Sequence, residues 1–250
     1  MNVKIPYVRI KGRELPRVLL GTSPFLGAGQ FGVKAYEYYR KFFKNPARVT
    51  ELVAGCIEIG VNGVQLVAYP QIGDAVKKAE EKKGARLKVV GSLPFDMPSQ
   101  ALKYLSEFDT VAALLHGEQT DKLNMEENRA WLKRIEDEGY LVGVATHNPA
   151  RTLPIVIREL EVDIVMMPLN KAGYMMGGMK GEEFMEIVES SGAKVIAMKP
   201  LAAGKINPRE AMGYVFSLKN VASVAVGVAS LKEAEETFSA AATALSRLKE

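Results

Sequence analysis

The chain alternates short apolar runs with longer amphipathic stretches about eight times between Arg17 and its C-terminus. The apolar runs are rich in β-branched residues and continuously apolar, as expected of strands buried on both faces of a parallel sheet. They span residues 18–20, 63–67, 87–91, 110–115, 141–145, 163–167, 194–198 and 222–226. The stretches between them predict helices near 48–59, 72–83, 99–107, 126–138, 151–160, 182–190, 208–217 and 231–248. Eight such units predict an α/β fold, a (β/α)8 TIM barrel that occupies residues 1–250 as one domain.

A different pattern precedes the first barrel strand. Residues 4–10 and 15–18 flank a polar, glycine-containing insert, which predicts a β-hairpin within residues 1–17. We expect this hairpin to plug the N-terminal end of the barrel, whose apolar interior would otherwise meet water. Two longer insertions, at 24–44 and 171–181, follow strands and should therefore lie over the barrel mouth, as mobile lids or as ordinary surface loops.

Composition narrows the classes of function. The single cysteine, Cys56, excludes an intrachain disulfide and any cysteine-built metal or iron–sulfur site. The charged start of the chain and the lack of a long apolar run argue against secretion and membrane spanning, so we expect a cytoplasmic protein. The net charge of +4 comes from lysines interspersed with glutamates, which predicts solvated helix faces and no nucleic-acid or membrane partner. Many Lys/Glu pairs would also suit a thermophile.

Polar side chains stand at the C-terminal ends of predicted strands, where barrel active sites form. The only two histidines, His116 and His147, end the fourth and fifth strands, and each has a catalytic or a purely structural interpretation. Lys199 ends the seventh strand, where its amine could neutralise an anion, donate a proton or form a Schiff base. Gln65 is polar within the second strand and faces either the barrel interior or the helix layer, where a buried amide needs a partner.

The last two units contain a weaker signal for an anion site. Gly204 and Lys205 follow the seventh strand, and Gly227 leads from the eighth strand to Ser230, which with Glu233 predicts a capping box. Backbone N–H groups and the helix dipole attract anions at such a helix start, and barrels commonly bind phosphate after strands seven and eight.

Five motifs together resemble the aldo-keto reductase superfamily over nearly the whole chain. They are Leu20-Gly21-Thr22-Ser23, Leu114-Leu115-His116, Gly143-Val144-Ala145-Thr146-His147-Asn148-Pro149, Pro168-Leu169-Asn170 and Met198-Lys199-Pro200-Leu201-Ala202-Ala203-Gly204-Lys205. The sequence is most similar to the branch whose members often carry a C-terminal iron–sulfur domain, but one cysteine implies no such cluster here. The resemblance implies an oxidoreductase that transfers hydride between NAD(P)H and a small carbonyl substrate, without a Rossmann fold.

The resemblance also implies roles for single residues. His116 matches the family's active-site histidine, and Asn148 matches the asparagine that holds the nicotinamide carboxamide. Gly227, Ser230 and Lys232 fall where the adenosine phosphates lie. The other residues expected to contact NADP or NAD stand in the same motifs and are Thr22, His147, Asn170, Met198 and Lys199.

The family's catalytic tetrad is altered in this chain. Gln65 replaces its aspartate, Tyr69 lies one residue short of its tyrosine, and residues 91–94 lack the lysine that ends strand three. Without those partners, Tyr69 is expected to titrate nearer the reference pKa of about 10, which makes it a poor acid at neutral pH. We therefore expect His116 to act as proton donor or oxyanion partner, with Tyr69 assisting and with Gln65 and Lys199 beside it.

Two other classes of function are compatible with these residues. A barrel lyase or isomerase would use Lys199, His116 and His147 on a phosphorylated or carboxylated substrate without nicotinamide. Its metal-dependent variant would add Asp96 or Glu118, but no ligand-spacing motif supports it, and we expect no metal. A non-catalytic binding protein would account for the altered tetrad. The pattern leaves the substrate, the choice between NAD and NADP and the oligomeric state open.

Overall fold

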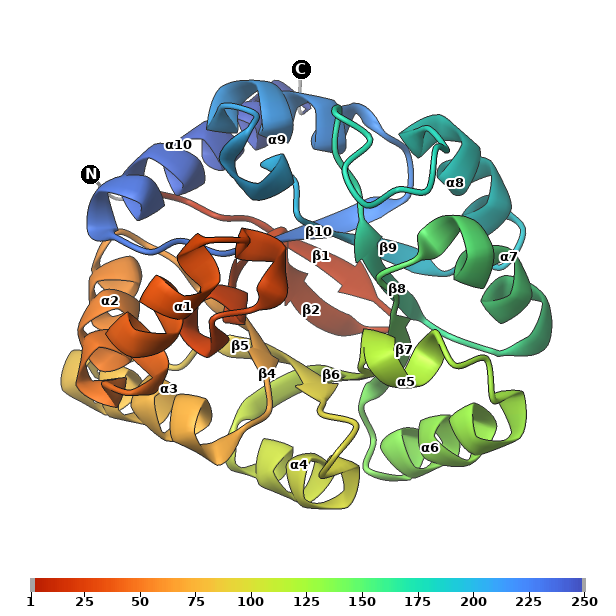
Figure 1. The fold of residues 1–250 in the computed structure, drawn as a ribbon, viewed down its shortest axis with the longest axis horizontal. Helices are drawn as coiled ribbons and strands as arrows, with labels where there is room; N and C mark the ends of the chain where they lie inside the picture. Colours follow the sequence, from red (N-terminus) through yellow and green to blue (C-terminus); the bar gives the residue numbers. More distant parts are fainter. Residues whose placement is uncertain (1–2, 249–250) are drawn as a thin grey trace.

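The computed structural model describes residues 3–248 of the chain. Eight parallel strands form a closed barrel in the order β10-β3-β4-β5-β6-β7-β8-β9, surrounded by helices (Figure 1). The predicted (β/α)8 barrel is confirmed. The strands are β3 (Val18–Gly21), β4 (Gly63–Val67), β5 (Lys88–Leu93), β6 (Asp109–Leu115), β7 (Leu141–Ala145), β8 (Ile164–Pro168), β9 (Lys194–Met198) and β10 (Val221–Val226).

The crossover helices lie where the amphipathic stretches placed them. They are α2 (Pro46–Glu58), α3 (Pro70–Lys83), α4 (Pro98–Tyr104), α6 (Met125–Asp137), α7 (Pro149–Glu159), α8 (Gly181–Glu189), α9 (Pro208–Ser217) and α10 (Leu231–Arg247). Helices α2, α3, α4 and α7 begin one or two residues before the predicted starts, because each begins with a proline. Proline suits a first helical turn, since its ring presets φ and its missing N–H would have no helical partner there.

The predicted hairpin is also present, as β1 (Tyr7–Ile10) and β2 (Arg13–Pro16). Lys11 and Gly12 both have positive φ at the two-residue turn, as hairpin turns with this twist require. Ile10 and Leu15 are buried in a cluster with residues that begin barrel strands, such as Leu141. The hairpin lies inside the outline of the barrel in Figure 1 and closes its N-terminal end.

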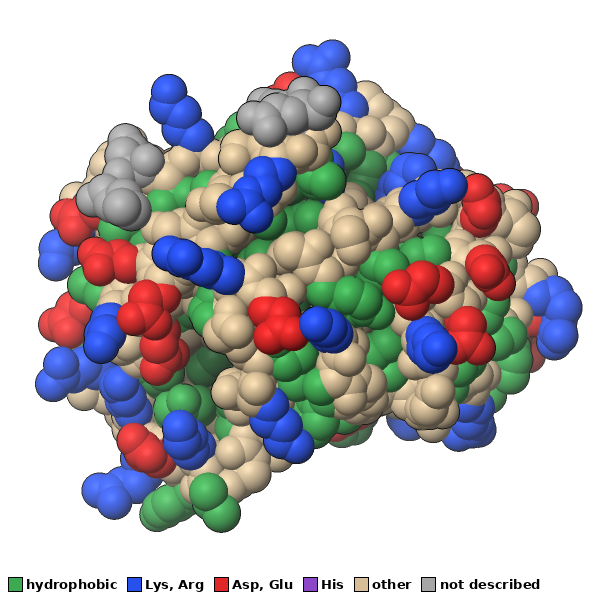
Figure 2. Space-filling view, turned by 90° about the horizontal axis from the view of Figure 1, so that it is seen from above, with side chains coloured by type: hydrophobic (Ala, Val, Ile, Leu, Met, Phe, Trp, Pro, Cys, Tyr) green, Lys and Arg blue, Asp and Glu red, His purple; other side chains and the backbone are tan. Residues whose placement is uncertain are grey.

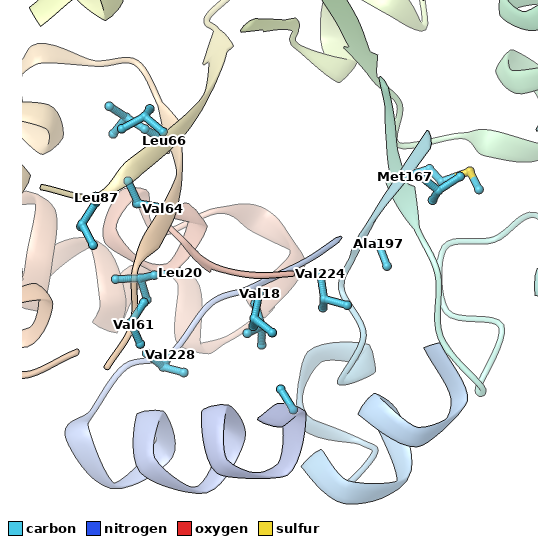
Figure 3. Close-up of a cluster of buried hydrophobic side chains, with 14 of the residues drawn as sticks. Val18, Leu20, Val61, Val64, Leu66, Leu87, Met167, Ala197, Val224 and Val228 are labelled. Atoms are coloured by element: carbon cyan, nitrogen blue, oxygen red, sulfur yellow. The ribbon is translucent and has the colours of Figure 1, made fainter. Parts of the chain in front are cut away.

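Successive residues of each barrel strand face opposite layers. Val64 and Leu66 of β4 belong to the outer cluster, which packs between strands and helices (Figure 3). Leu19 of β3 belongs to the inner cluster, while its neighbour Leu20 belongs to the outer one. Because Gln65 lies between Val64 and Leu66, its side chain faces the barrel interior and not the helix layer.

Short helices occupy segments that the sequence analysis treated as loops. Between β3 and α2 lie η1 (Ser23–Leu26), η2 (Gly29–Phe31), α1 (Lys34–Tyr38) and η3 (Tyr39–Phe43). Elsewhere the chain forms α5 (Gly117–Thr120) and η5 (Ala202–Gly204). The helix predicted over residues 99–107 is divided into α4 and the short η4 (Leu105–Glu107). The first group is held by an aromatic cluster in which the rings of Phe25 and Phe42, both buried, lie 5.2 Å apart. That packing is tertiary, so hydrophobic periodicity along the segment did not reveal it.

The outer surface is polar and mixed in charge. On the face shown in Figure 2, lysine and arginine side chains alternate with aspartate and glutamate, with no extended patch of one sign. Among residues 3–248, no helix is both long enough and apolar enough to cross a membrane.

Candidate functional site

A cavity of about 780 Å³ opens at the C-terminal ends of the barrel strands. Its volume falls within the range of small-molecule and cofactor sites. The strand ends contribute the polar residues Gln65, Ser92, His116, His147 and Lys199 to its wall. The two insertions contribute Gln30, Phe31, Val33, Lys34, Tyr38 and Tyr174. Four of the residues predicted from sequence to carry chemistry therefore meet at one cavity: Gln65, His116, His147 and Lys199.

Two buried polar side chains lie in the barrel at the bottom of this cavity. Gln65 Nε2 donates a hydrogen bond of 3.0 Å to Ser92 Oγ, and both residues are buried. This contact supplies the partner that a buried amide needs. The residue that replaces the family's aspartate is thus an uncharged member of the cavity wall.

The two histidines and the lysine form one cluster. The rings of His116 and His147 meet edge to face, with centroids 5.4 Å apart. Lys199 Nζ lies 3.2 Å from His147 Nδ1 and 3.6 Å from Met198 Sδ. Because these residues end β6, β7 and β9, the parallel register of the barrel brings them to the same edge.

Burial sets the protonation states of this cluster. It lowers the pKa of Lys199 to about 8, opposed by the negative charge of Asp121. Burial also lowers the pKa of His147 to about 4, with further lowering by the nearby Lys199 cation. The pKa of His116 is lowered mainly by burial, against the opposing charge of Glu118. At neutral pH both imidazoles are therefore uncharged, while Lys199 is mostly an ammonium ion.

Hydrogen bonds define which ring nitrogen carries the proton. An ammonium can only donate, so His147 Nδ1 accepts from Lys199 and the proton of this ring lies on Nε2. His116 Nδ1 accepts from the backbone N–H of Glu118 at 3.3 Å, which likewise leaves its proton on Nε2. Each histidine thus retains one N–H donor for another partner.

Asp121 anchors the turn that presents His147, a role that the sequence analysis missed. Its carboxylate accepts from the backbone N–H of His147 at 2.8 Å and from the hydroxyls of Thr146 and Thr152. The available signal was its place five residues after His116, just beyond the end of a barrel strand. Three donors already surround this carboxylate, so it acts as a structural support of the site.

The backbone after β9 adopts an unusual conformation. Lys199, Ala202 and Ala203 all have left-handed φ, at 56°, 48° and 59°. Such conformations cost a non-glycine residue about 1–3 kcal/mol and gather at functional sites, where the surrounding structure holds them. In this protein, the three left-handed residues turn the chain directly after β9, where Lys199 lines the cavity.

Tyr69 is not among the residues that line the cavity. Its hydroxyl donates a hydrogen bond of 3.1 Å to the carboxylate of Asp96. Burial and the negative charge of Asp96 raise the pKa of Tyr69 to about 12. A phenol with this partner and this pKa is a poor proton donor at neutral pH.

Thr22 and Asn170 also lie outside the cavity wall, where they fasten backbone. Thr22 Oγ1 accepts from the backbone N–H of Val67, and Asn170 bonds both the N–H and the carbonyl of Tyr174. The Tyr174 hydroxyl in turn donates to the carbonyl of Gln30 at 3.2 Å. This last bond, which sequence reasoning missed, joins the two insertions across the mouth.

The other residues expected to contact the cofactor divide into two groups. Gly227 and Met198 line the cavity, and a Cβ at Gly227 would lie 2.5 Å from Pro24. Asn148 and Lys232 are exposed and Ser230 is half-buried, and none of the three is in the lining.

Ser230 instead caps α10. Its hydroxyl accepts from the backbone N–H of Glu233 at 3.2 Å. The Glu233 carboxylate accepts from Ala229 at 2.8 Å and not from Ser230, so only half of the predicted capping box forms.

Carboxylates stand at the outer end of the cavity. Glu233 and Glu236 of α10 line it together with Lys34, Lys205 and Thr237. Sequence reasoning missed Glu236, which lies one and a half turns into α10. Within residues 3–248, no group of three or more His, Cys, Asp or Glu side chains is placed to hold a metal ion.

Similar folds occur among solved structures of aldo-keto reductases. The Pseudomonas aeruginosa protein PA4992, described as an aldo-keto reductase, superposes with a TM-score of 0.70 at 20% identity, over 98% of this chain and 97% of its own. The holo form of the aldo-keto reductase AKR11C1 from Bacillus halodurans gives 0.67 at 15% identity, over 98% and 96%. The glycerol dehydrogenase AKR11B4 from Gluconobacter oxydans gives 0.62 at 15% identity, over 96% and 95%.

These likenesses extend over nearly the whole chain and confirm the resemblance at the level of the fold. No protein-family profile and no curated protein sequence matches the chain.

Proposed function

We propose that this protein is an aldo-keto-reductase-like oxidoreductase that uses a nicotinamide cofactor to reduce a small carbonyl compound at the barrel mouth. The observation that carries the proposal is the meeting of His116 and Lys199 in one cavity at the C-terminal ends of the strands. The likeness in fold to aldo-keto reductases, one of them in a holo form, supports it. So do the motifs at these strand ends.

The cavity fits such a cofactor in size and in lining. It runs from the His116–Lys199 cluster to Gly227 and the first turns of α10. The absence of a side chain at Gly227 permits the close approach of β10 to Pro24, which shapes this part of the wall. Met198 and Gly227 are the predicted cofactor residues that we retain, with His147 and Lys199 beside the reacting end. When bound, the nicotinamide would supply the hydride.

Two residues of the chain would act on the carbonyl oxygen. Neutral His116 would donate its Nε2–H and so orient the carbonyl and stabilise developing negative charge. The Lys199 ammonium, with its pKa lowered to about 8, would give the proton that completes the alcohol. Tyr69 is a weaker candidate than in the sequence analysis, because Asp96 holds its hydroxyl and raises its pKa.

The outer end of the cavity favours NADH over NADPH. No arginine is found among the described residues that line the cavity, and Glu236 stands in its wall. A carboxylate can accept from a ribose 2′-hydroxyl, whereas it repels a 2′-phosphate. Glu236→Lys should therefore shift the ratio of dissociation constants toward NADPH. Glu235→Lys, one residue away and outside the lining, is the matched control and should leave the ratio unchanged.

The remaining part of the proposal concerns the cellular location of the protein and the molecules it binds. We propose a cytoplasmic enzyme with a small-molecule substrate and no nucleic-acid or membrane partner. The interspersed charges of the outer surface support this, because they offer no basic patch on the face shown in Figure 2.

Steady-state kinetics of single variants tests the proposed roles. With a carbonyl substrate found by screening with NADH, His116→Ala should lower kcat/KM by about 10²–10³, as the loss of an oxyanion donor does. Lys199→Met should lower it by about 10²–10⁴, as the loss of a general acid does. Tyr69→Phe is the control and should leave turnover close to that of the wild type. Full turnover in both the His116 and the Lys199 variants would contradict the proposal.

A further inference from the structure

Lys199 differs from the lysines that stabilise the surface of this protein. Lys11, Lys77, Lys133 and Lys171 each pair with at least one carboxylate. Lys199 has no ion pair within residues 3–248, and its nitrogen contacts a neutral imidazole and a thioether instead. Its charge is therefore not compensated by a direct partner.

The surroundings of this nitrogen favour the uncharged amine. Met166, Met198 and Ala145 belong to one buried apolar cluster, and all three line the cavity together with His147. This burial lowers the pKa of Lys199 to about 8, so about one tenth of the residue is free amine at pH 7. A free amine beside an open cavity is a nucleophile toward carbonyl carbon.

We propose that the Lys199 amine forms a reversible imine with a small 2-oxo acid or aldehyde bound in the barrel-mouth cavity. The reaction requires no nicotinamide, so it goes beyond the function proposed above. It uses the amine form of the residue whose ammonium form donates a proton in carbonyl reduction.

The reaction balances without an oxidant or a reductant. The lone pair of Lys199 Nζ attacks the carbonyl carbon, a C–N bond forms, and the π electrons of the C=O bond move to oxygen. The nitrogen loses two protons, the oxygen gains both, and the oxygen leaves as water while the C=N bond forms. Hydrolysis reverses these steps and releases the carbonyl compound.

His147 is placed to orient the Lys199 nitrogen by accepting a hydrogen bond from it, and so acts as a positioning residue. Its Nδ1 lies 3.2 Å from Nζ and accepts an N–H, which directs the nitrogen lone pair elsewhere. Asp121 fixes the ring through the backbone N–H of His147. The Nε2–H of His116 is available to the carbonyl oxygen, and Gln65 with Ser92 offers further hydrogen bonds to a carboxylate or hydroxyl group.

Reductive trapping with glyoxylate tests this inference. The purified protein is treated at pH 6.5 with glyoxylate and cyanoborohydride, without nicotinamide, and carboxymethylated lysines are quantified by peptide mass spectrometry. At this pH a lysine with a pKa of about 8 has a neutral fraction roughly two hundredfold larger than one near the reference value of about 10.4. We expect modification of Lys199 to exceed that of Lys205 at least tenfold, allowing for the greater exposure of Lys205.

Two variants and the pH dependence of the rate distinguish specific modification of Lys199 from unspecific modification of surface lysines. Lys199→Arg keeps the charge and should abolish the preferred modification, while Lys205→Arg, at the outer part of the same cavity, should leave it intact. The rate of Lys199 modification in the wild type should rise with pH to a midpoint near 8, and His147→Gln should slow it. Equal modification of Lys199 and Lys205 in the wild type would overturn the inference. NADH binding is measured separately, so loss of one result does not imply loss of the other.

Discussion

Burial at the barrel mouth lowers the pKa values of Lys199 and His147 well below the usual ranges of these side chains. Both groups bear less positive charge in the folded protein than they would in water at the same pH. The folding free energy therefore depends on pH through each of them.

The change in folding stability at acid pH gives a prediction for His147. Its pKa is about 4 in the folded protein and about 6.5 in the unfolded chain, so the unfolded state binds more protons between these values. Wild-type stability should therefore fall as the pH decreases from 6.5 to 4, by at most about 3 kcal/mol from this residue. Urea denaturation at pH 7 and pH 4.5 measures the loss. It should be smaller in His147→Gln, and an equal loss in both proteins would refute the assignment.

A second residue-scale prediction concerns Asp121. Three donors converge on its carboxylate, and hydrogen bonds to a charged group contribute about 1.5–3 kcal/mol each. Asp121→Asn places an amide donor against these donors and should destabilise the protein by about 2–3 kcal/mol. Asp96→Asn is the control, because this exposed carboxylate bonds only the Tyr69 hydroxyl among the hydrogen bonds described and should change stability little. Similar unfolding midpoints for the two variants in denaturant would show that Asp121 does not anchor the turn.

Sequence predicted the positions of His116, His147 and Lys199 because each stands at the end of an apolar run, and strand ends share one edge of a barrel. It could not predict that His147 Nδ1 accepts from Lys199 or that Asp121 supports the turn. Those contacts join residues 52 and 26 positions apart. Tyr69 shows the converse case. The resemblance to the family's tyrosine suggested a place in the site, whereas its hydroxyl is hydrogen-bonded to Asp96 outside the cavity wall.

The close packing of β7 against β8 explains why a glycine stands at position 143, and it predicts the effect of adding a methyl group there. A Cβ on Gly143 of β7 would lie 2.7 Å from the carbonyl oxygen of Ile164 on β8, and backbone cannot yield as a side chain does. Gly143→Ala should therefore destabilise the protein by about 1–3 kcal/mol, as overpacking does. In contrast, a Cβ on Gly213 of α9 meets no atom within 4 Å, so Gly213→Ala should stabilise the protein by up to about 1 kcal/mol.

Thermal or chemical denaturation of the two glycine variants gives the comparison. Opposite signs are expected, because both changes add one methyl group but only one site has room for it. A Gly143→Ala protein as stable as the wild type would mean that β7 and β8 are spaced more widely than the structure shows.

The sequence predicted the barrel strands and crossover helices but not the short helices between them. The hydrophobic periodicity predicts the strands and the crossover helices. The predicted helix starts lie within two residues of the observed ones, and the two-residue differences occur at helices that begin with a proline. The short helices between β3 and α2 were not predicted, because contacts such as that between Phe25 and Phe42 stabilise them. Since Phe31, Val33 and Tyr38 of this segment line the cavity, part of the site could not be derived from local pattern.

At the scale of the whole molecule, closure of the barrel unites residues that are far apart in the chain. The mouth combines the segment after β3, the cluster at β6, β7 and β9, and the start of α10. The hairpin β1/β2 closes the opposite end (Figure 1). The cavity is lined by the strand ends and by the loops that follow them. This arrangement predicts one site, with the reacting end in the barrel and with Glu236 at the outer end.

A titration of the wild-type protein with NADH tests the central claim most directly, with cofactor fluorescence and the melting temperature as readouts. We expect saturable binding, with a stabilisation of about 2.7 kcal/mol when free NADH reaches a hundred times its dissociation constant. We also expect weaker binding of NADPH. A melting temperature and a fluorescence signal unchanged by either nucleotide would contradict the account, since a barrel that binds no nicotinamide cannot transfer its hydride.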